Sequence, residues 1–159
     1  GHFDHAENAA RLSEALDAPI GMDAGDLDLI ASNGAQDLFA ETFLGKIVLA
    51  ASLRDFSARP MPIFQPDVLL HEGDLLSDYG IDARILSLPG HTAGSIGVDV
   101  DGEHLLVGDA LMNMFYPTVS MLFHDREAML ESAGKIGALG GRIIHFGHGR
   151  PIPNRQWVK

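Results

Sequence analysis

The N-terminal part of the chain carries the apolar spacing of helices. Residues 6–16 are rich in helix-forming side chains, and Ala9, Leu12 and Leu16 are spaced to share one helix face. We predict that this helix ends before Pro19, because the residue preceding a proline avoids the helical conformation. The other elements predicted in this part are a short strand at 20–22, one or two helices at 26–31 and 35–44, an apolar element at 46–53 that fits either a helix or a strand, and a loop at 59–62.

After Asp67 the pattern changes to short segments rich in strand-forming residues. Asp101 and Gly102 separate two of these segments and indicate a hairpin, since glycine accepts the positive φ of a tight turn. A helix is predicted at 125–139. The predicted strands lie at 68–71, 83–88, 96–100, 104–107 and 142–146. This order of elements predicts a layered α/β domain in which helices cover a sheet.

Composition narrows the class of protein. With 159 residues, 46% of them hydrophobic, the chain is long enough for one domain with a core, and we expect one domain over 1–159. The net charge of −11 argues against a nucleic-acid partner, which would need clustered Lys and Arg. The apolar runs are too short to span a bilayer, so we expect a soluble, cytoplasmic protein without a membrane partner. Because the chain has no cysteine, any metal must be held by histidine and carboxylate.

Residues of the metal-binding type are concentrated at four places. His2, Asp4 and His5 stand within the first five positions. In an extended backbone the first two would point the same way, and a turn after Asp4 would bring His5 beside them. Alone, this cluster could be the remnant of an affinity tag. Three further candidates, each directly preceded by glycine at the end of a predicted strand, argue for a site instead: His91, Asp109 and His148. Imidazoles and carboxylates suit zinc, iron or manganese.

Several other residues have more ordinary interpretations. His71, His104 and His124 fall outside these motifs, and His145 is expected to be structural or to support a ligand. Three acidic residues are interpreted as helix-start acids: Asp23, Asp26 and Asp28. A group of apolar residues near Asp109 could line a substrate pocket, although core or dimer positions are more common for such side chains: Met112, Met114, Phe115, Tyr116 and Phe123.

In this order and at these separations, the four motifs resemble those of the metallo-β-lactamase-fold hydrolases, and are most similar to the hydroxyacylglutathione hydrolase branch. The resemblance implies an αββα sandwich, of which this chain would be the C-terminal portion with the first strands missing, so that the domain 1–159 is incomplete at its N-terminus. It also implies two metal sites. One would be held by His2, His91 and a histidine preceding Gly1, the other by Asp4, His5 and His148, and Asp109 would bridge the two ions.

The function implied by this resemblance is metal-dependent hydrolysis. Two divalent ions, zinc or alternatively iron or manganese, would share a hydroxide that attacks an ester, thioester or related acyl bond, with Asp4 and Asp109 as catalytic residues. The alternatives are an iron-dependent oxidoreductase of the sulfur dioxygenase or flavodiiron type, and an inactive fragment with a broken first metal site. The expected partners are a small-molecule acyl substrate and either a second copy or the missing N-terminal fragment, because an apolar sheet face and a strand edge should be exposed.

Overall fold

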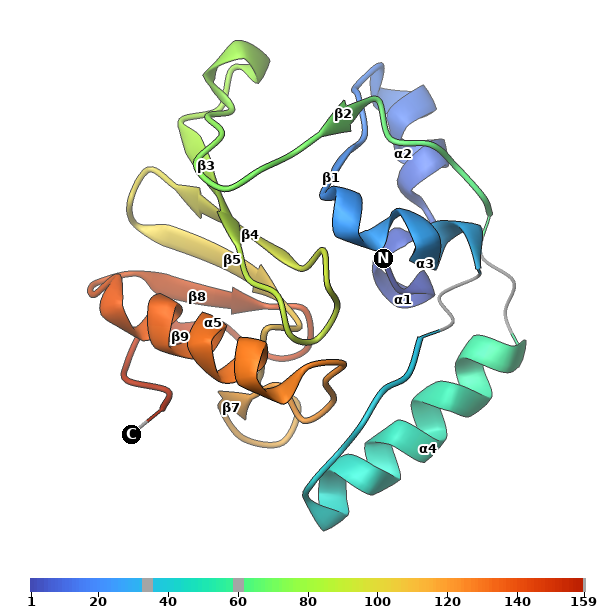
Figure 1. Cartoon of the computed structure of the whole chain (residues 1–159). Helices are drawn as coiled ribbons and strands as arrows, with labels where there is room; N and C mark the ends of the chain where they lie inside the picture. Colours follow the sequence, from blue (N-terminus) through green and yellow to red (C-terminus); the bar gives the residue numbers. More distant parts are fainter. Residues whose placement is uncertain (33–35, 59–61, 159) are drawn as a thin grey trace.

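The structure, a computed structural model, describes residues 1–32, 36–58 and 62–158 (Figure 1). Two short helices open the chain, α1 (Phe3–Ala6) and α2 (Ala9–Leu16). The single helix predicted over 6–16 is therefore wrong at its start, because a turn at residues 7–8 separates α1 from α2. Leu12 and Leu16 are 55% and 69% exposed, so the predicted apolar face does not lie against a core in the described part of the chain.

The next elements are the 3-10 turn η1 (Ala24–Asp26), α3 (Leu27–Ala31), α4 (Phe43–Ala58) and a parallel pair of short strands, β1 (Gly21–Met22) and β2 (Val68–Leu69). The strand at 20–22 and the helix at 26–31 are confirmed, and the run 46–53 is helical. The helix predicted at 35–44 is wrong for residues 36–42, because the N–H of Phe39 donates to the carbonyl of Phe123 at 2.8 Å instead. Residue 35 and residues 59–61 of the predicted loop lie outside the described residues.

Within the described residues, the main sheet has five strands in the order β3 (Ala83–Ser87), β4 (Ile96–Val100), β5 (His104–Gly108), β8 (Ile143–Phe146) and β9 (Ile152–Pro153). The predicted hairpin between β4 and β5 is confirmed, with φ of 53° at Asp101 and 66° at Gly102. A small antiparallel pair, β6 (Leu111–Met112) and β7 (Thr118–Val119), and a 3-10 turn, η2 (Ser77–Tyr79), lie outside this sheet. The α/β class predicted from the sequence is confirmed.

The strand directions bring three loops to one edge of the main sheet. β4 is antiparallel to both β3 and β5, and β8 is parallel to β5. It follows that β3, β5 and β8 all run in the same direction and that their C-terminal ends meet at one edge. The loops that carry His91, Asp109 and His148 follow these three strands. The topology therefore gathers residues that are far apart in the sequence.

Helix α5 (Arg126–Ala138) covers one face of the main sheet (Figure 1). It begins after Asp125, whose side chain accepts a hydrogen bond from the N–H of Ala128 at 3.0 Å and so satisfies one of the free donors of the first turn. The core between helix and sheet consists of residues from both layers that are at most 1% exposed: Leu105, Val107, Ala133, Ile136 and Ile144. Burying a side chain of this size contributes about 1.5–3 kcal/mol, so this layer holds the three loops in place.

Helix α4 lies apart from the sheet (Figure 1). None of its described side chains belongs to either apolar core cluster. Phe43 and Ile47 remain 81% and 53% exposed. Neither α4 nor any other helix within the ranges 1–32, 36–58 and 62–158 is long and apolar enough to cross a membrane.

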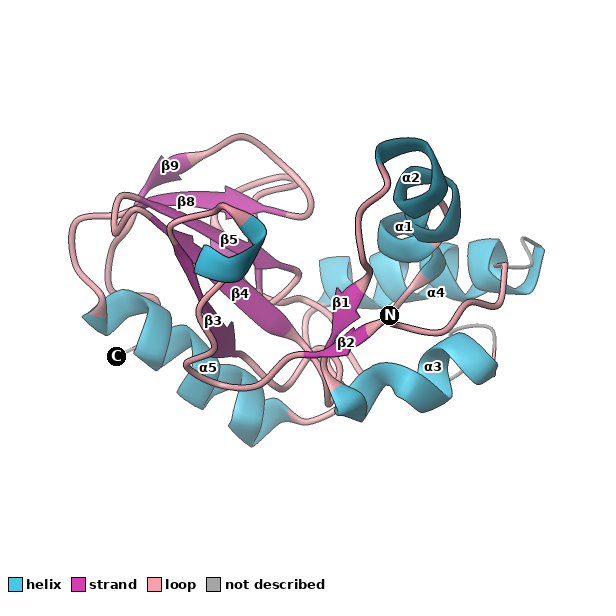
Figure 2. Cartoon of the chain, turned by 90° about the horizontal axis from the view of Figure 1, so that it is seen from above, coloured by secondary structure: helices cyan, strands magenta, loops and turns pink. Residues whose placement is uncertain are grey.

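Helix α5 lies on one face of the main sheet (Figure 2), and the opposite face is partly exposed to solvent at Leu106. Across neighbouring strands the register aligns Ile85, Val98, Leu106 and His145 on this face. Leu106 is 45% exposed, and a cavity of about 490 Å³ adjoins Ile85 and Val98. The expected exposure of an apolar sheet face is therefore only partial, since Leu106 reaches solvent whereas Ile85 is fully buried. The outer edge of β3 is not open, because the N–H of Gly73 donates to the carbonyl of Ile85 at 2.9 Å.

The exposure of Leu106 on this face leads us to expect that the chain self-associates, since exposed apolar surface favours contact with another such surface. Sedimentation velocity should show a mass that rises with protein concentration, and Leu106→Lys should weaken that rise. Leu12→Lys, which changes a similarly exposed leucine of α2, serves as the control and should leave it unchanged. A monomeric mass at every concentration would contradict the expectation.

Candidate metal centre

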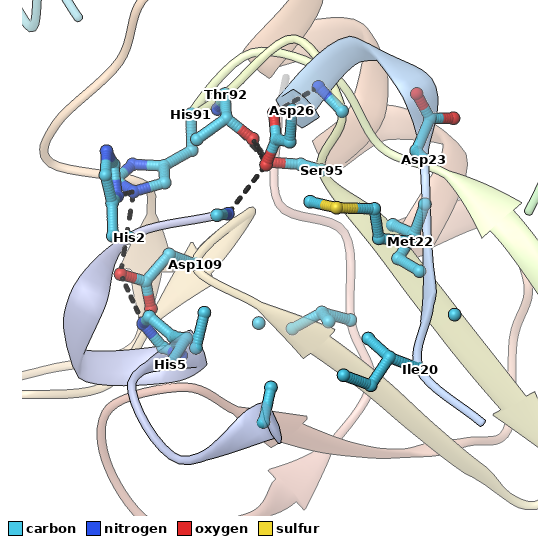
Figure 3. Close-up of a pocket in the computed structure, with 18 of the residues that line it drawn as sticks. His2, His5, Ile20, Met22, Asp23, Asp26, His91, Thr92, Ser95 and Asp109 are labelled. Atoms are coloured by element: carbon cyan, nitrogen blue, oxygen red, sulfur yellow. Dashed lines mark hydrogen bonds and ion pairs between the residues drawn. The ribbon is translucent and has the colours of Figure 1, made fainter. Parts of the chain in front are cut away.

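Three loops and the start of the chain meet around the carboxylate of Asp109. Its Oδ2 atom lies within ion-pair distance of three Nε2 atoms, at 3.4 Å from His5, 3.7 Å from His91 and 3.5 Å from His148. Figure 3 shows His5 and His91 pointing toward this carboxylate. One carboxylate therefore contacts imidazoles from the N-terminus and from two different strand ends.

A first group of ligand-type side chains consists of Asp4, His5 and His148. Oδ2 of Asp4 lies 3.3 Å from Nε2 of His148 and 3.8 Å from Nε2 of His5. One ligand atom from each of the three residues lies within 4.8 Å of the others, which is close enough to hold one metal ion. The side chains are about one third exposed, so this group is reachable from solvent.

A second group consists of His2 and His91, whose side chains are buried. Nδ1 of His2 lies 3.1 Å from Nε2 of His91. Nδ1 of His91 lies 2.8 Å from the carbonyl oxygen of Leu122, and because a carbonyl can only accept, Nδ1 donates to it. Nε2 of the same neutral ring is then unprotonated, and its lone pair is directed at the centre. The candidate residues thus divide into a trio and a pair with Asp109 between them. All six residues that the sequence singled out are brought together.

The N-terminal motif is a helical turn. His2 is extended, with φ of −75° and ψ of 156°, but α1 begins at Phe3, and the N–H groups of His5 and Ala6 donate to the carbonyl of His2 at 3.1 Å and 3.0 Å. The expectation of an extended backbone up to Asp4 is therefore wrong. Since the turn starts two residues earlier, it buries Phe3 and leaves Asp4 and His5 free to face His148.

A β-bulge directs Asp109 toward the centre. The register of β5 against β8 shifts between Leu106 and Gly108, which turns the chain just before the carboxylate. Gly108 has a φ of 53°, a conformation that favours glycine. The N–H of Gly147 donates to the carbonyl of Gly108 at 2.8 Å, and this bond joins the loop of His148 to the loop of Asp109.

Gly147 is also required for reasons of space. A Cβ atom at this position would overlap Oδ1 of Asp109 and Cε1 of His5. The glycine before His148 therefore lets the backbone approach two ligand-type side chains more closely than any other residue would allow.

The donor set fits divalent metal ions. Oδ1 of Asp109 is buried and has no hydrogen-bond partner among the described residues, which is unusual for a carboxylate oxygen and calls for a cation nearby. Four imidazoles and two carboxylates are the ligand types that zinc, iron and manganese accept. A pair and a trio of ligands on either side of one carboxylate suit a centre in which that carboxylate contacts two ions.

Comparison with known proteins agrees with this geometry. The model of the Metallo-beta-lactamase superfamily matches residues 1–148. The chain belongs to this superfamily. A protein of Aquifex aeolicus (strain VF5), described as uncharacterized, is 28% identical over 112 residues, which make up 70% of this chain and 46% of the relative. The chain thus spans about half the length of the curated relative that it matches.

Solved structures show the same fold. The structure of TTHA1623 in a di-iron-bound form is 27% identical to this metallo-beta-lactamase superfamily chain, with a TM-score of 0.66, and the match covers 96% of this chain and 68% of that one. The BLEG-1 B3 metallo-beta-lactamase is 21% identical with a TM-score of 0.69, over the same shares of the two chains. The metallo-beta-lactamase fold expected from the motifs is therefore confirmed.

The pair and the trio of this superfamily member differ in charge. Burial lowers the pKa of His2 to about 3, and burial also lowers the pKa of His91. The ion pair with Asp109 and then that with Asp4 raise the pKa of His148 to about 10, and Asp109 likewise raises the pKa of His5. At neutral pH the pair is therefore neutral, and His148 carries a proton.

The same ion pairs with the histidines keep the carboxylates of Asp109 and Asp4 ionised. Burial alone would raise the pKa of Asp109, but its contacts with His148 and His5 outweigh burial and hold that pKa well below its usual range. In Asp4, the contact with His148 and the charge of His5 likewise outweigh burial and lower the pKa. Protons on the imidazoles thus supply the positive charge that the carboxylates require.

Metal affinity at the trio should therefore rise with pH, because a metal ion must displace the protons of His148 and His5. Between pH 6 and pH 9 we expect the affinity for Zn²⁺ to rise about tenfold per pH unit for each proton displaced. Calorimetric titration in buffers of different ionisation enthalpy would count the protons, with about one to two expected at pH 7. Binding without proton release would contradict the protonated trio.

Three further residues support the centre, and two of them, Gln36 and Ser120, stand in no recognisable motif. Gln36 donates from Nε2 to Nε2 of His2 at 2.8 Å and to the carbonyl of His91 at 3.2 Å. The hydroxyl of Ser120 donates to the carbonyl of Leu122 at 2.6 Å and lies 3.3 Å from Nδ1 of His91. The contacts of Gln36 with His2 and of Ser120 with His91 join segments remote in the sequence and leave no local pattern. They fix the orientation of the buried pair.

Asp26 is the third. Its interpretation as a plain helix-start acid is incomplete, because it is only 2% exposed. Oδ1 accepts from the N–H of Gly94 at 2.7 Å, and Oδ2 accepts from the hydroxyl of Thr92 at 2.9 Å (Figure 3). Asp26 therefore anchors the loop that carries His91. Asp23, by contrast, caps η1 as expected, accepting from the N–H of Gly25 at 2.8 Å.

The remaining candidate residues lie elsewhere. His145 does not support a ligand; its Nε2 lies 3.0 Å from Nδ1 of His104 on the open sheet face. His71 is exposed beside Asp74, and Nδ1 of His124 donates to the carbonyl of Asp37 at 3.0 Å. Of the apolar residues near Asp109, three line a cavity at the metal centre, namely Met112, Met114 and Phe115, whereas Tyr116 and Phe123 line a separate cavity of about 110 Å³.

Proposed function

We propose that this protein is a metal-dependent hydrolase that cleaves an ester, thioester or related acyl bond at a binuclear centre. The observation that carries the proposal is the buried carboxylate of Asp109, which has three imidazole nitrogens within 3.7 Å of Oδ2 and an Oδ1 without a hydrogen-bond partner in the described part of the chain. Superfamily membership supports it, since that fold is typical of metal-dependent hydrolases. The motif resemblance favours a place near the hydroxyacylglutathione hydrolases.

Each residue has a role that follows from its surroundings. Asp4, His5 and His148 would hold one ion, His2 and His91 would contribute to the other, and Asp109 would contact both. Two divalent ions, when bound, lower the pKa of a shared water toward about 7 and polarise a carbonyl oxygen. The Leu122 carbonyl and Gln36 orient the buried rings. The carboxylate of Asp4, which is about one third exposed, would take up a proton from the water and pass it to the leaving group.

Iron is the second candidate for this centre. The structure of TTHA1623 was solved in a di-iron-bound form, and that protein is 27% identical to this chain. If this chain also takes iron, oxidative chemistry of the sulfur dioxygenase or flavodiiron kind becomes the alternative to hydrolysis. Metal analysis of protein purified from its source, together with oxygen consumption, separates the two functions.

The proposal is tested by removing and restoring the metals. Protein loaded with Zn²⁺, Fe²⁺ or Mn²⁺ should hydrolyse p-nitrophenyl esters or acyl thioesters, lose this activity in chelator and regain it when metal is added. Hydrolysis that survives complete metal removal would overturn the proposal.

Calorimetric titration of the chain as given tests the inactive-fragment alternative. Tight binding of two metal equivalents supports a functional pair of sites. Binding of only one metal equivalent, without hydrolysis, supports an inactive chain in which the site of His2 and His91 is incomplete.

A further inference from the structure

One face of helix α4 forms a wall of a cavity at the metal centre. Five of its residues line a space of about 350 Å³, and they stand one, four, five and eight positions after the first of them: Ile47, Val48, Ala51, Ser52 and Asp55. Such spacing places side chains on one side of a helix. The floor of the same space holds five of the six ligand-type residues: His2, Asp4, His91, Asp109 and His148. A molecule bound against α4 would therefore have its reacting bond at the centre.

The cavity is largely apolar from its depth to its mouth. Met112 and Leu122 lie in its depth and are 2% and 3% exposed. Met114, Phe115 and Ile47 are 42% to 59% exposed and stand toward solvent. Two of the five α4 residues in the wall are polar, and three are aliphatic. A volume of this size is within the range of small-ligand pockets.

Away from the histidines of the centre, the charged residues that line the cavity are all acidic. Its charged residues, apart from the histidines, are Asp4, Asp55 and Asp109, and no lysine or arginine is among the described residues that line it. A ligand with a carboxylate at the far end of its acyl chain, away from the centre, would find no lysine or arginine among the described lining residues and would approach Asp55. An uncharged chain would meet mainly aliphatic, thioether and aromatic side chains, with Ser52 and Asp55 as the polar residues of the α4 wall.

A second cavity of about 320 Å³, drawn in Figure 3, also reaches the centre. It lies beside β1 and is lined by Ile20, Met22 and Phe64, together with His5 but without Asp4 or His148. Because Asp4 is the group placed to handle a proton, a substrate in that space would be separated from it. The cavity under α4 is the one that joins an apolar wall to Asp4.

We propose that the cavity under α4 binds the acyl chain of an uncharged fatty-acyl ester or thioester. This inference rests on the proposed hydrolase function. In the reaction, the oxygen of water bonds to the acyl carbon, the bond from that carbon to the alcohol oxygen or thiol sulfur breaks, and the leaving group takes a proton, giving a fatty acid and an alcohol or thiol. The α4 wall sets the preferred chain length.

A series of p-nitrophenyl esters from acetyl to decanoyl tests the preference. On the metal-loaded full chain, kcat/KM should rise by about fourfold per added methylene until the cavity is filled, which corresponds to the burial of one CH₂ group. Adding a terminal carboxylate to the acyl chain should lower kcat/KM by about fivefold or more, and Asp55→Asn should reduce that penalty.

Two adjacent alanines of α4 provide a matched pair of variants. Both are exposed, but Ala51 lines the cavity and Ala50 does not. Ala51→Asp should lower the octanoyl-to-acetyl ratio of kcat/KM by about tenfold, because a charge would enter the apolar wall. Ala50→Asp carries the same substitution on the same helix and should leave that ratio unchanged. Equal ratios in the two variants would overturn the proposal.

Binding without turnover separates this proposal from the hydrolase function. Straight-chain methyl ketones resemble the esters but are not hydrolysed, and their affinity can be measured by calorimetry. Affinity that rises from 2-hexanone to 2-decanone and falls in Ala51→Asp supports the cavity even if no ester is cleaved, in which case only the hydrolase function fails. Hydrolysis that is indifferent to chain length, with no ketone binding, would refute the cavity proposal and leave the hydrolase function standing.

Discussion

Replacing Asp109 with asparagine is expected to abolish the metal centre. The carboxylate contacts three imidazoles, and its buried Oδ1 has no hydrogen-bond partner among the residues that the structure describes, so its charge serves both groups of ligand-type residues. An amide keeps the size but removes the charge that offsets bound cations. We expect bound metal to fall from about two equivalents to one or none, and hydrolysis to fall by at least about 100-fold. Metal analysis after gel filtration and ester hydrolysis are the measurements.

The matched control is Asp78→Asn, which makes the same change on the exposed turn η2. It should keep full metal content and activity. If Asp109→Asn retained two metal equivalents with unchanged affinity, the bridging role of Asp109 would be wrong. Circular dichroism of both variants would show whether the fold is kept.

Gly147→Ala is expected to have the second-largest effect, although it adds only one methyl group. The new Cβ would overlap Oδ1 of Asp109 and Cε1 of His5, so one or both of these side chains must move. Since ligand geometry must hold within a few tenths of an ångström, we expect metal affinity to fall by about 100-fold. The affinity for Zn²⁺ should be measured by competition with a chromogenic chelator.

Gly141→Ala is the control for this change, because a Cβ at Gly141 would meet no atom within 4 Å. It should bind Zn²⁺ like the parent chain. Unchanged affinity in Gly147→Ala would mean that the loop of His148 can retreat without disturbing the centre, which the hydrogen bond from the N–H of Gly147 to Gly108 argues against.

The ligand-type residues could be found in the sequence because their signals are local. A strand, a glycine and then a ligand-type residue follow one another directly at His91, Asp109 and His148. The strand directions then bring these three residues together, because β3, β5 and β8 run the same way and their C-terminal ends lie side by side. The backbone at the N-terminal motif was predicted wrongly, because the same spacing of His2 and Asp4 fits an extended chain and a helical turn starting at Phe3.

The residues that support the centre could not be found in this way. Gln36 and Leu122 contact His2 and His91 across 34 and 31 positions of the chain, and neither stands in a pattern typical of a ligand site. Asp26 reaches Gly94 across 68 positions, and an acidic residue at a helix start gives no sign of burial. Such contacts depend on how loops meet in three dimensions.

The helices of the N-terminal part were predicted less well than the sheet. Periodicity did not distinguish helix from strand at 46–53, because α4 carries apolar residues on more than one face, among them Ile47 and Leu53, which are 53% and 45% exposed. Leu12 and Leu16 form an apolar stripe on α2 without a core to cover in the described residues. Apolar spacing predicts a helix, but it does not predict what that helix packs against.

The position of α4 outside both apolar cores has an evolutionary consequence. Substitutions in a helix that no core depends on are tolerated at little cost in folding free energy, whereas changes around Asp109 would reach the α5 layer. Preference for a new compound could therefore drift while the reactive machinery stays intact. Related proteins with this fold could therefore differ in substrate range through substitutions in a single surface helix.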